Sequence, residues 1–142
     1  MIERHESVVV TTFVRLAVPV AQLFGLYVLV HGHESPGGGF QAGVILAGTY
    51  ILLALGRGPE TLTRHVNEPR WVALAAAGVL LYLVVGLTGL PRGAFLDYAG
   101  LPIDGARARW LGILLIETGV TLTVTTTLVV IFCRLAAREP AP

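Results

Sequence analysis

The segment 31–42, HGHESPGGGFQA, places two imidazoles and a carboxylate beside three consecutive glycines in an otherwise apolar chain. These residue types could cradle a phosphate, bind a metal ion, or open a polar path at the start of a helix. A phosphate loop needs a preceding strand and a Lys-Ser or Lys-Thr after its glycines, and this chain has no Lys. A zinc site needs three or four ligands, and only His31, His33 and Glu34 are close together here. We therefore expect neither a phosphate loop nor a metal site.

Two interpretations of this segment remain open. In the first it is a tight turn, because Pro36 ends the preceding extended stretch and the glycines let the backbone turn without steric cost. In the second it is a partly unwound helix start that lines a path for ions or water, which a membrane tolerates where protein or a water-filled cavity covers the backbone. Under either interpretation, small residues spaced four apart favour close approach of another helix. These helix-packing residues are Gly39, Gly43 and Ala47.

Two ionisable residues lie inside apolar stretches. Glu117, in WLGILLIETGVTLTVTTTLVV, is followed at helical spacing by Thr121 and Thr125, and Arg15 shares a helix face with Gln22. A charge at the centre of a bilayer costs at least about 2.5–3.5 kcal/mol, so such groups face the bundle interior, pair, or change protonation. Glu117 fits either a structural pair or a proton or cation relay, and Arg15 can instead extend to the headgroups. The Thr hydroxyls can line a polar path or bond back to their own helix.

The elements that position these residues are predicted from composition. The chain of 142 residues is 54% hydrophobic and 13% charged, about half the charge of an ordinary soluble domain. A bilayer core about 30 Å thick needs roughly 20 apolar residues as a helix. We predict one all-α membrane domain, 1–142, a bundle of four transmembrane helices with a Gly-rich turn between the first and second. The spans are 8–30, 38–56, 71–90 and 110–133. The first is too long for a cleavable signal sequence and another span follows it.

Both ends of a four-span chain lie on one side of the membrane, and the distribution of Arg predicts which side. More Arg flank the spans on the side of the termini, so we expect cytoplasmic termini. That side carries Arg4, Arg57, Arg64, Arg70, Arg134 and Arg138, against Arg92, Arg107 and Arg109 on the other.

Other features exclude several classes of protein. The net charge of +1 offers no basic surface for nucleic acid. The single Cys permits no internal disulfide. No arrangement of Ser, His and Asp or of Cys and His indicates nucleophilic catalysis, so we expect no enzyme.

Two stretches carry a family resemblance. YVLVHGHESPGGGFQAGVILAGTYILLAL resembles the hallmark hairpin of the MrpB (MnhB) family, which runs roughly G-H-x-x-P-G-G-G-F before a helix of small residues. LLIETGVTLTVTTTLVVIF resembles that family's last span, and the size and four-span layout also agree. Where the family often has Asn two residues before the Pro, this chain has Glu34. The matched positions are Gly32, His33, Pro36, Gly37, Gly38, Gly39, Phe40 and the span acid Glu117.

The resemblance implies a role in transport. Members of the family are small subunits of Mrp-type Na⁺/H⁺ antiporter complexes in bacterial membranes, with relatives in archaeal-type membrane hydrogenases. It implies a bacterial or archaeal cell membrane, large antiporter-like subunits as partners, and no cofactor in this chain. Three hypotheses follow. The chain contributes Glu117 to an ion path for Na⁺ or another monovalent cation against H⁺, it only braces the assembly, or it couples a redox-driven ion pump such as a membrane-bound hydrogenase.

Overall fold

The computed structural model describes residues 8–34, 37–103 and 105–137, and the described residues form helices and connections with no strand. Four helices are long and apolar enough to cross a membrane. The predicted all-α bundle of four transmembrane helices is therefore confirmed. These helices are α1 (Val8–Val30), α2 (Gly38–Arg57), α4 (Glu68–Leu87) and α5 (Gly105–Ala136).

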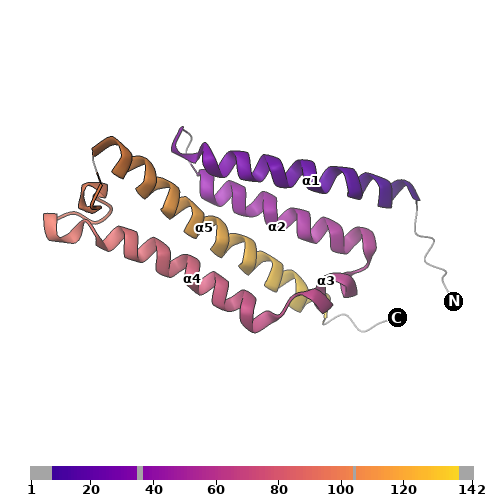
Figure 1. The fold of residues 1–142 in the computed structure, drawn as a ribbon. Helices are drawn as coiled ribbons and strands as arrows, with labels where there is room; N and C mark the ends of the chain where they lie inside the picture. Colours follow the sequence, from indigo (N-terminus) through magenta and orange to yellow (C-terminus); the bar gives the residue numbers. More distant parts are fainter. Residues whose placement is uncertain (1–7, 35–36, 104, 138–142) are drawn as a thin grey trace.

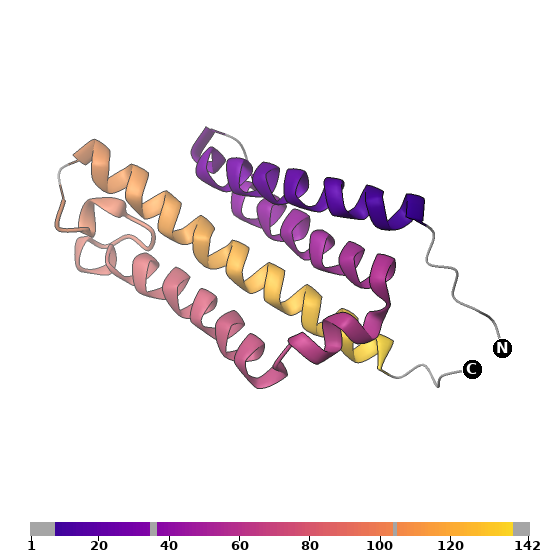
Figure 2. The ribbon, with the colours of Figure 1, turned by 45° about the vertical axis from the view of Figure 1, so that its right-hand side comes forward.

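The long helices lie side by side in the order α1, α2, α5, α4 (Figure 1), so α5 contacts both α2 and α4. The turned view shows the same order, with α5 running along the middle of the bundle (Figure 2). The start of α1, the end of α2 and the end of α5 lie at one end, here called the terminal end. The opposite end carries the α1–α2 turn and the α4–α5 connection, and is called the turn end.

The α1–α2 turn is built from a short 3₁₀ helix, Gly32–Glu34, and a left-handed residue before α2. Gly37 has φ of 88°, a conformation that L side chains rarely adopt, so the glycine is required at this position. Gly37 is the N-cap of α2 and provides no side-chain cap. Pro36, which was expected to end an extended stretch, lies outside the described residues.

At the terminal end a seven-residue helix that the hydropathy pattern does not predict, α3 (Pro59–His65), packs beneath α2. Gly58 precedes it with φ of 95°, and Pro59 suits its first turn because that position needs no N–H. Leu62 of α3 joins the buried core of the bundle, where Ala47 and Val129 are fully buried.

Two helices begin earlier than apolar content alone indicates. α4 starts at Glu68, where the Asn67 side chain accepts the N–H of Arg70 at 3.3 Å. α5 starts at Gly105. The polar and arginine residues before its apolar stretch can also adopt a helix, which therefore projects beyond that stretch. The connection before α5 contains the 3₁₀ helices Leu90–Arg92 and Tyr98–Gly100.

Candidate functional site

The carboxyl group of Glu117 on α5 lies in the α1–α2 turn. A Cβ placed on Gly32 would collide with this carboxyl, and one placed on Gly38 would be 3.2 and 3.3 Å from its two oxygens. A Cβ on Gly39 would be 2.6 Å from the backbone oxygen of Glu117. Gly32 therefore leaves room for the carboxyl, Gly38 for the Cα of Gly32, and Gly39 for the backbone of α5 at Glu117. We call Gly32, Gly38 and Gly39 the glycine cradle.

The cradle also brings the start of α2 close to the acid. The first intrahelical bond of α2 runs from the N–H of Gln41 to the carbonyl of Gly37, at 2.9 Å. The preceding N–H groups, from Gly38 to Phe40, therefore have no partner within the helix, and they form its electropositive end. Among the described residues no side chain donates a hydrogen bond to Glu117, so backbone dipoles and Cα hydrogens form its nearest surroundings.

Two further polar residues, His33 and Glu34, follow the cradle residue Gly32 in the turn and are exposed. The Nδ1 of His33 is 3.2 Å from the carbonyl of Val30, and its Nε2 is 3.7 Å from Oε1 of Glu34. The side chain of His33 is 33% exposed and that of Glu34 is 68% exposed, so the pair reaches from the bundle to its surface. His31 is 3.0 Å from the carbonyl of Tyr27 and stacks on its ring. Within the described residues no group of three metal-binding side chains comes together.

The Thr face of α5 packs on the small-residue face of α2. The hydroxyl of Thr121 donates to the carbonyl of Gly39 at 2.9 Å, and that of Thr125 donates to the carbonyl of Gly43 at 3.2 Å. A Cβ on Gly43 would be 2.7 Å from Cβ of Val124, so the helices approach closely there. Ala47, one turn further along α2, is fully buried. These contacts hold the cradle against the turn of α5 that carries Glu117.

The opposite face of α5 packs on α4 by the same means, which the sequence analysis missed. A Cβ on Gly78 would be 2.5 Å from the carbonyl oxygen of Gly119, and Thr123 donates to the carbonyl of Ala75 at 3.1 Å. Near the turn end, a Cβ on Gly112 would collide with the ring of Tyr98. The two glycines of α5 are seven residues apart in the sequence, and this spacing was the signal that could have predicted the packing on α4.

Tyr98, in the α4–α5 connection, interacts electrostatically with the site. Burial raises the pKa of the Tyr98 phenol, and the nearby Tyr82 and Glu117 raise that pKa further, while Arg109 lowers it. Tyr98 is thus close enough to Glu117 to sense its charge.

Gln22 and Arg15, the two polar candidates on α1, do not contact the acid. Gln22 donates to the hydroxyl of Thr49 at 3.4 Å and lines a groove of about 390 Å³ between α1 and α5, together with Thr121 and Thr125. Arg15 is exposed on the terminal half of α1.

The position of Arg15 along the axis of the bundle follows from its neighbour Val14, which packs on Gly56 of α2. Glu117 packs on Gly39 of the same helix. At 1.5 Å per residue these two levels are about 25 Å apart. Arg15 and Glu117 therefore do not form a pair.

Comparison with known proteins matches residues 9–130 to a family described as a domain related to the MnhB subunit of Na⁺/H⁺ antiporter. A Na⁺/H⁺ antiporter subunit of Bacillus subtilis is 31% identical over 137 residues, which are 89% of this chain and 95% of that protein. The Na⁺/H⁺ antiporter subunit of the same type from Alkalihalophilus pseudofirmus is 27% identical over 136 residues, covering 88% and 94% of the two chains. A putative antiporter subunit mnhB2 of Staphylococcus aureus is 40% identical over 52 residues, 37% of each chain.

Proposed function

The chain belongs to the MnhB-related family of Na⁺/H⁺ antiporter subunits, and from this membership we propose how it serves transport. It is a small multi-pass membrane subunit of a multi-subunit monovalent cation/proton antiporter. Its partners are other membrane subunits of that complex, and among them we propose large antiporter-like subunits. The redox-driven pump that the sequence left open is not favoured by these relatives.

We propose that Glu117 is the exchangeable acid that this subunit contributes to the ion path. A carboxylate can hold either a proton or a hard cation such as Na⁺, which suits it to exchange. The observation that supports this role is the glycine cradle, which surrounds the carboxyl with backbone and supplies no competing side-chain donor from the described residues. The electropositive start of α2 favours a negative charge nearby, so Glu117 can release its proton or cation and bind another.

The route between this acid and the surface passes through the turn. His33 and Glu34 lie 3.7 Å apart, directly after the cradle residue Gly32 in the chain, and both side chains reach the surface. The two ring nitrogens of a histidine can accept and donate protons, so we propose that His33 passes a proton between the surface and Glu117. We propose the turn as the mouth of the path. From the excess of Arg at the terminal end we also propose that the termini are cytoplasmic.

The other candidates have supporting roles in this proposal. The hydroxyls of Thr121 and Thr125 donate to carbonyls of α2, and Gln22 donates to Thr49 on α2, so these side chains hold the helices that carry the cradle. Arg15 lies about 25 Å from the level of the acid and takes no part in exchange there.

The test is Glu117→Gln, which keeps the shape of the side chain and removes its ability to ionise. The purified complex, assembled to the parental level, should lose at least about tenfold of its cation/proton exchange in proteoliposomes, as expected when a group that must bind the proton cannot do so. Glu60→Gln is the matched control, because Glu60 is exposed on α3 and, among the described residues, pairs only with Arg64, at 3.7 Å. Exchange at the parental rate by assembled Glu117→Gln complex would leave the subunit with a purely structural role.

A further inference from the structure

A groove runs along α2 from the turn end to the terminal end. The part nearer the turn end, here called the upper part, is about 390 Å³ and has walls from α1, α2 and α5 that include Leu26, Leu46 and Leu122. The part nearer the terminal end, here called the lower part, is about 220 Å³, lies between the end of α2 and α3, and includes Leu53. Tyr50 lines both parts, so they adjoin at this side chain of α2.

The walls of the upper part present mostly hydrocarbon, although Gln22, whose Nε2 donates to Thr49, and three Thr residues line it. The hydroxyl of Thr118 donates to the carbonyl of Leu114 at 2.7 Å. Those of Thr121 and Thr125 donate to α2 at 2.9 and 3.2 Å. With their hydroxyls engaged, these side chains offer methyl groups to the groove. A hydrocarbon chain suits such walls better than an ion does.

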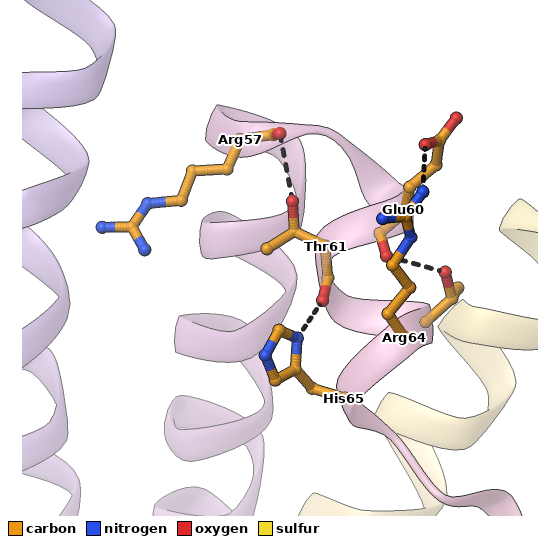
Figure 3. Close-up of polar contacts among 6 residues, drawn as sticks. Arg57, Glu60, Thr61, Arg64 and His65 are labelled. Carbon is orange, nitrogen blue, oxygen red and sulfur yellow. Dashed lines mark hydrogen bonds and ion pairs between the residues drawn. The ribbon is translucent and has the colours of Figure 1, made fainter.

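The mouth of the groove at the terminal end is cationic. Arg57 is exposed and forms no ion pair with any residue that the structure describes. The Nδ1 of His65 is 2.6 Å from the carbonyl of Thr61, which leaves its Nε2 available to another group. Figure 3 shows Arg57 extending away from α3, whereas Arg64 turns to the other side of that helix toward Glu60. The nearest described acid of α3 is therefore already engaged with a different cation.

Arg15 adds a second guanidinium at this height. Its position on α1 is seven residues before Gln22 and eleven before Leu26, which places it on the stripe that lines the groove. Its neighbour Val14 packs on Gly56, immediately before Arg57. Two arginines from neighbouring helices thus lie at one level, that of the last residue of α2.

We propose that this groove binds one anionic phospholipid. The phosphate lies at Arg57, with Arg15 and His65 beside it, and an acyl chain follows the flank of α2 past Leu53 and Tyr50. Guanidinium groups bind phosphate with charge-assisted hydrogen bonds, and basic residues at a membrane surface attract anionic headgroups. The charge of the mouth favours this occupant over a partner's apolar helix, which would offer neither arginine an anion.

The test uses the assembled complex in phosphatidylcholine nanodiscs with a small fraction of phosphatidylglycerol that carries a photoreactive group on its acyl chain. Mass spectrometry of the labelled peptides should place adducts on α2, and a phosphatidylcholine probe of the same chain should give far fewer. Arg57→Gln should lower labelling about fivefold, as expected for one basic residue at a membrane surface. Arg57→Lys should restore most of it, and Arg64→Gln, whose guanidinium pairs with Glu60, should leave it unchanged.

Three results would overturn the proposal. Equal labelling by the two probes would mean that the groove meets bulk lipid without choosing a headgroup. Displacement of the probe by millimolar inorganic phosphate would indicate a free anion instead of a lipid. Absence of adducts on α2 would mean that a partner subunit occupies the groove.

Discussion

The carboxyl group of Glu117 lies so close to the Cα of Gly32 that a methyl group on that carbon would collide with it. This relationship joins the two features of the sequence that looked chemically unusual, the glycine-rich turn and the acid of the last span. It gives the run of glycines a physical reason beyond the bending of the chain. The turn is shaped around a carboxyl group, and its first requirement is the absence of side chains.

Gly32→Ala tests this requirement directly. The added methyl group would displace the acid or the turn, and overpacking of this kind costs typically 1–3 kcal/mol. We expect the assembled complex to melt at a lower temperature and to exchange cations at least about tenfold more slowly. Thermal unfolding of detergent-purified complex and exchange in proteoliposomes measure the two effects.

Gly48→Ala is the control for that substitution. Gly48 lies within α2, and nothing is found within 4 Å of a Cβ placed there. The replacement should be neutral or stabilising by up to about 1 kcal/mol, because Ala loses less conformational freedom in a helix than Gly. If Gly32→Ala behaved like Gly48→Ala, the turn would not be shaped around the acid.

The close approach of α2 and α5 should fail when Gly43 is enlarged. A Cβ at this position would be 2.7 Å from Cβ of Val124, and a longer side chain has nowhere to extend. We expect Gly43→Leu to reduce the yield of assembled complex severely, with no transport detectable in what remains. Gly48→Leu, five residues along the same helix, should assemble at the parental level. The measurement is the yield of monodisperse complex by size-exclusion chromatography, and equal yields would contradict the packing.

Removing the hydroxyl of Thr121 should weaken the bundle without abolishing exchange. Thr121→Val keeps the shape and loses the bond to the carbonyl of Gly39, worth about 0.6 kcal/mol on average for interhelical bonds in membranes and at most about 1.7. Thr121→Ser should recover most of the lost thermal stability. Transport by assembled Thr121→Val complex should stay within about twofold of the parent, since the side chain holds the cradle and carries no ion. A loss as large as that of Glu117→Gln would assign the hydroxyl to the path itself.

The four spans could be predicted because apolar length is a local property, and α1 is described over Val8–Val30. Helix ends set by capping were predicted less well. Asn67 and the Pro that follows Glu68 begin α4 three residues before its apolar stretch, and α3 is too short to register in a span-length window. Cap residues and glycines of positive φ were the signals that could have located these boundaries.

The partners of each candidate residue could not be predicted. The sequence placed Glu117 and Arg15 inside spans but could not show that one lies at the turn end and the other near the terminal end, because this depends on the offset between α1, α2 and α5. For Thr121 it offered a polar path or a bond back to its own helix, and the bond to the carbonyl of Gly39 on α2 was not predicted. Tyr98, in the α4–α5 connection, packs on α5 where Gly112 admits its ring, a contact that the sequence does not indicate.

The charge state of Glu117 should be measurable through Tyr98. Burial raises the pKa of the Tyr98 phenol, and the negative charge of Glu117 is one of the further groups that raise it. Glu117→Gln removes that charge, so the pKa of Tyr98 should move down toward the ordinary value for tyrosine. Ultraviolet difference titration, with Tyr98→Phe to assign the signal, measures the shift. Glu34→Gln removes a charge from the exposed face of the turn and should leave the titration unchanged.

The same relationship fixes how stability depends on alkaline pH. A phenol whose pKa is higher in the folded than in the unfolded protein favours the folded state at neutral pH, and this contribution is lost as the pH rises above the unfolded value of about 10. The parent complex should therefore lose more thermal stability between neutral pH and strongly alkaline pH than Tyr98→Phe does. Glu117→Gln should lie between them, because burial, the larger cause, remains. Two results would show that the acid is not ionised beside Tyr98: a parallel loss of stability in all three proteins, or a Tyr98 titration that Glu117→Gln leaves unchanged. The exchange proposed for Glu117 would then have to begin from its protonated form.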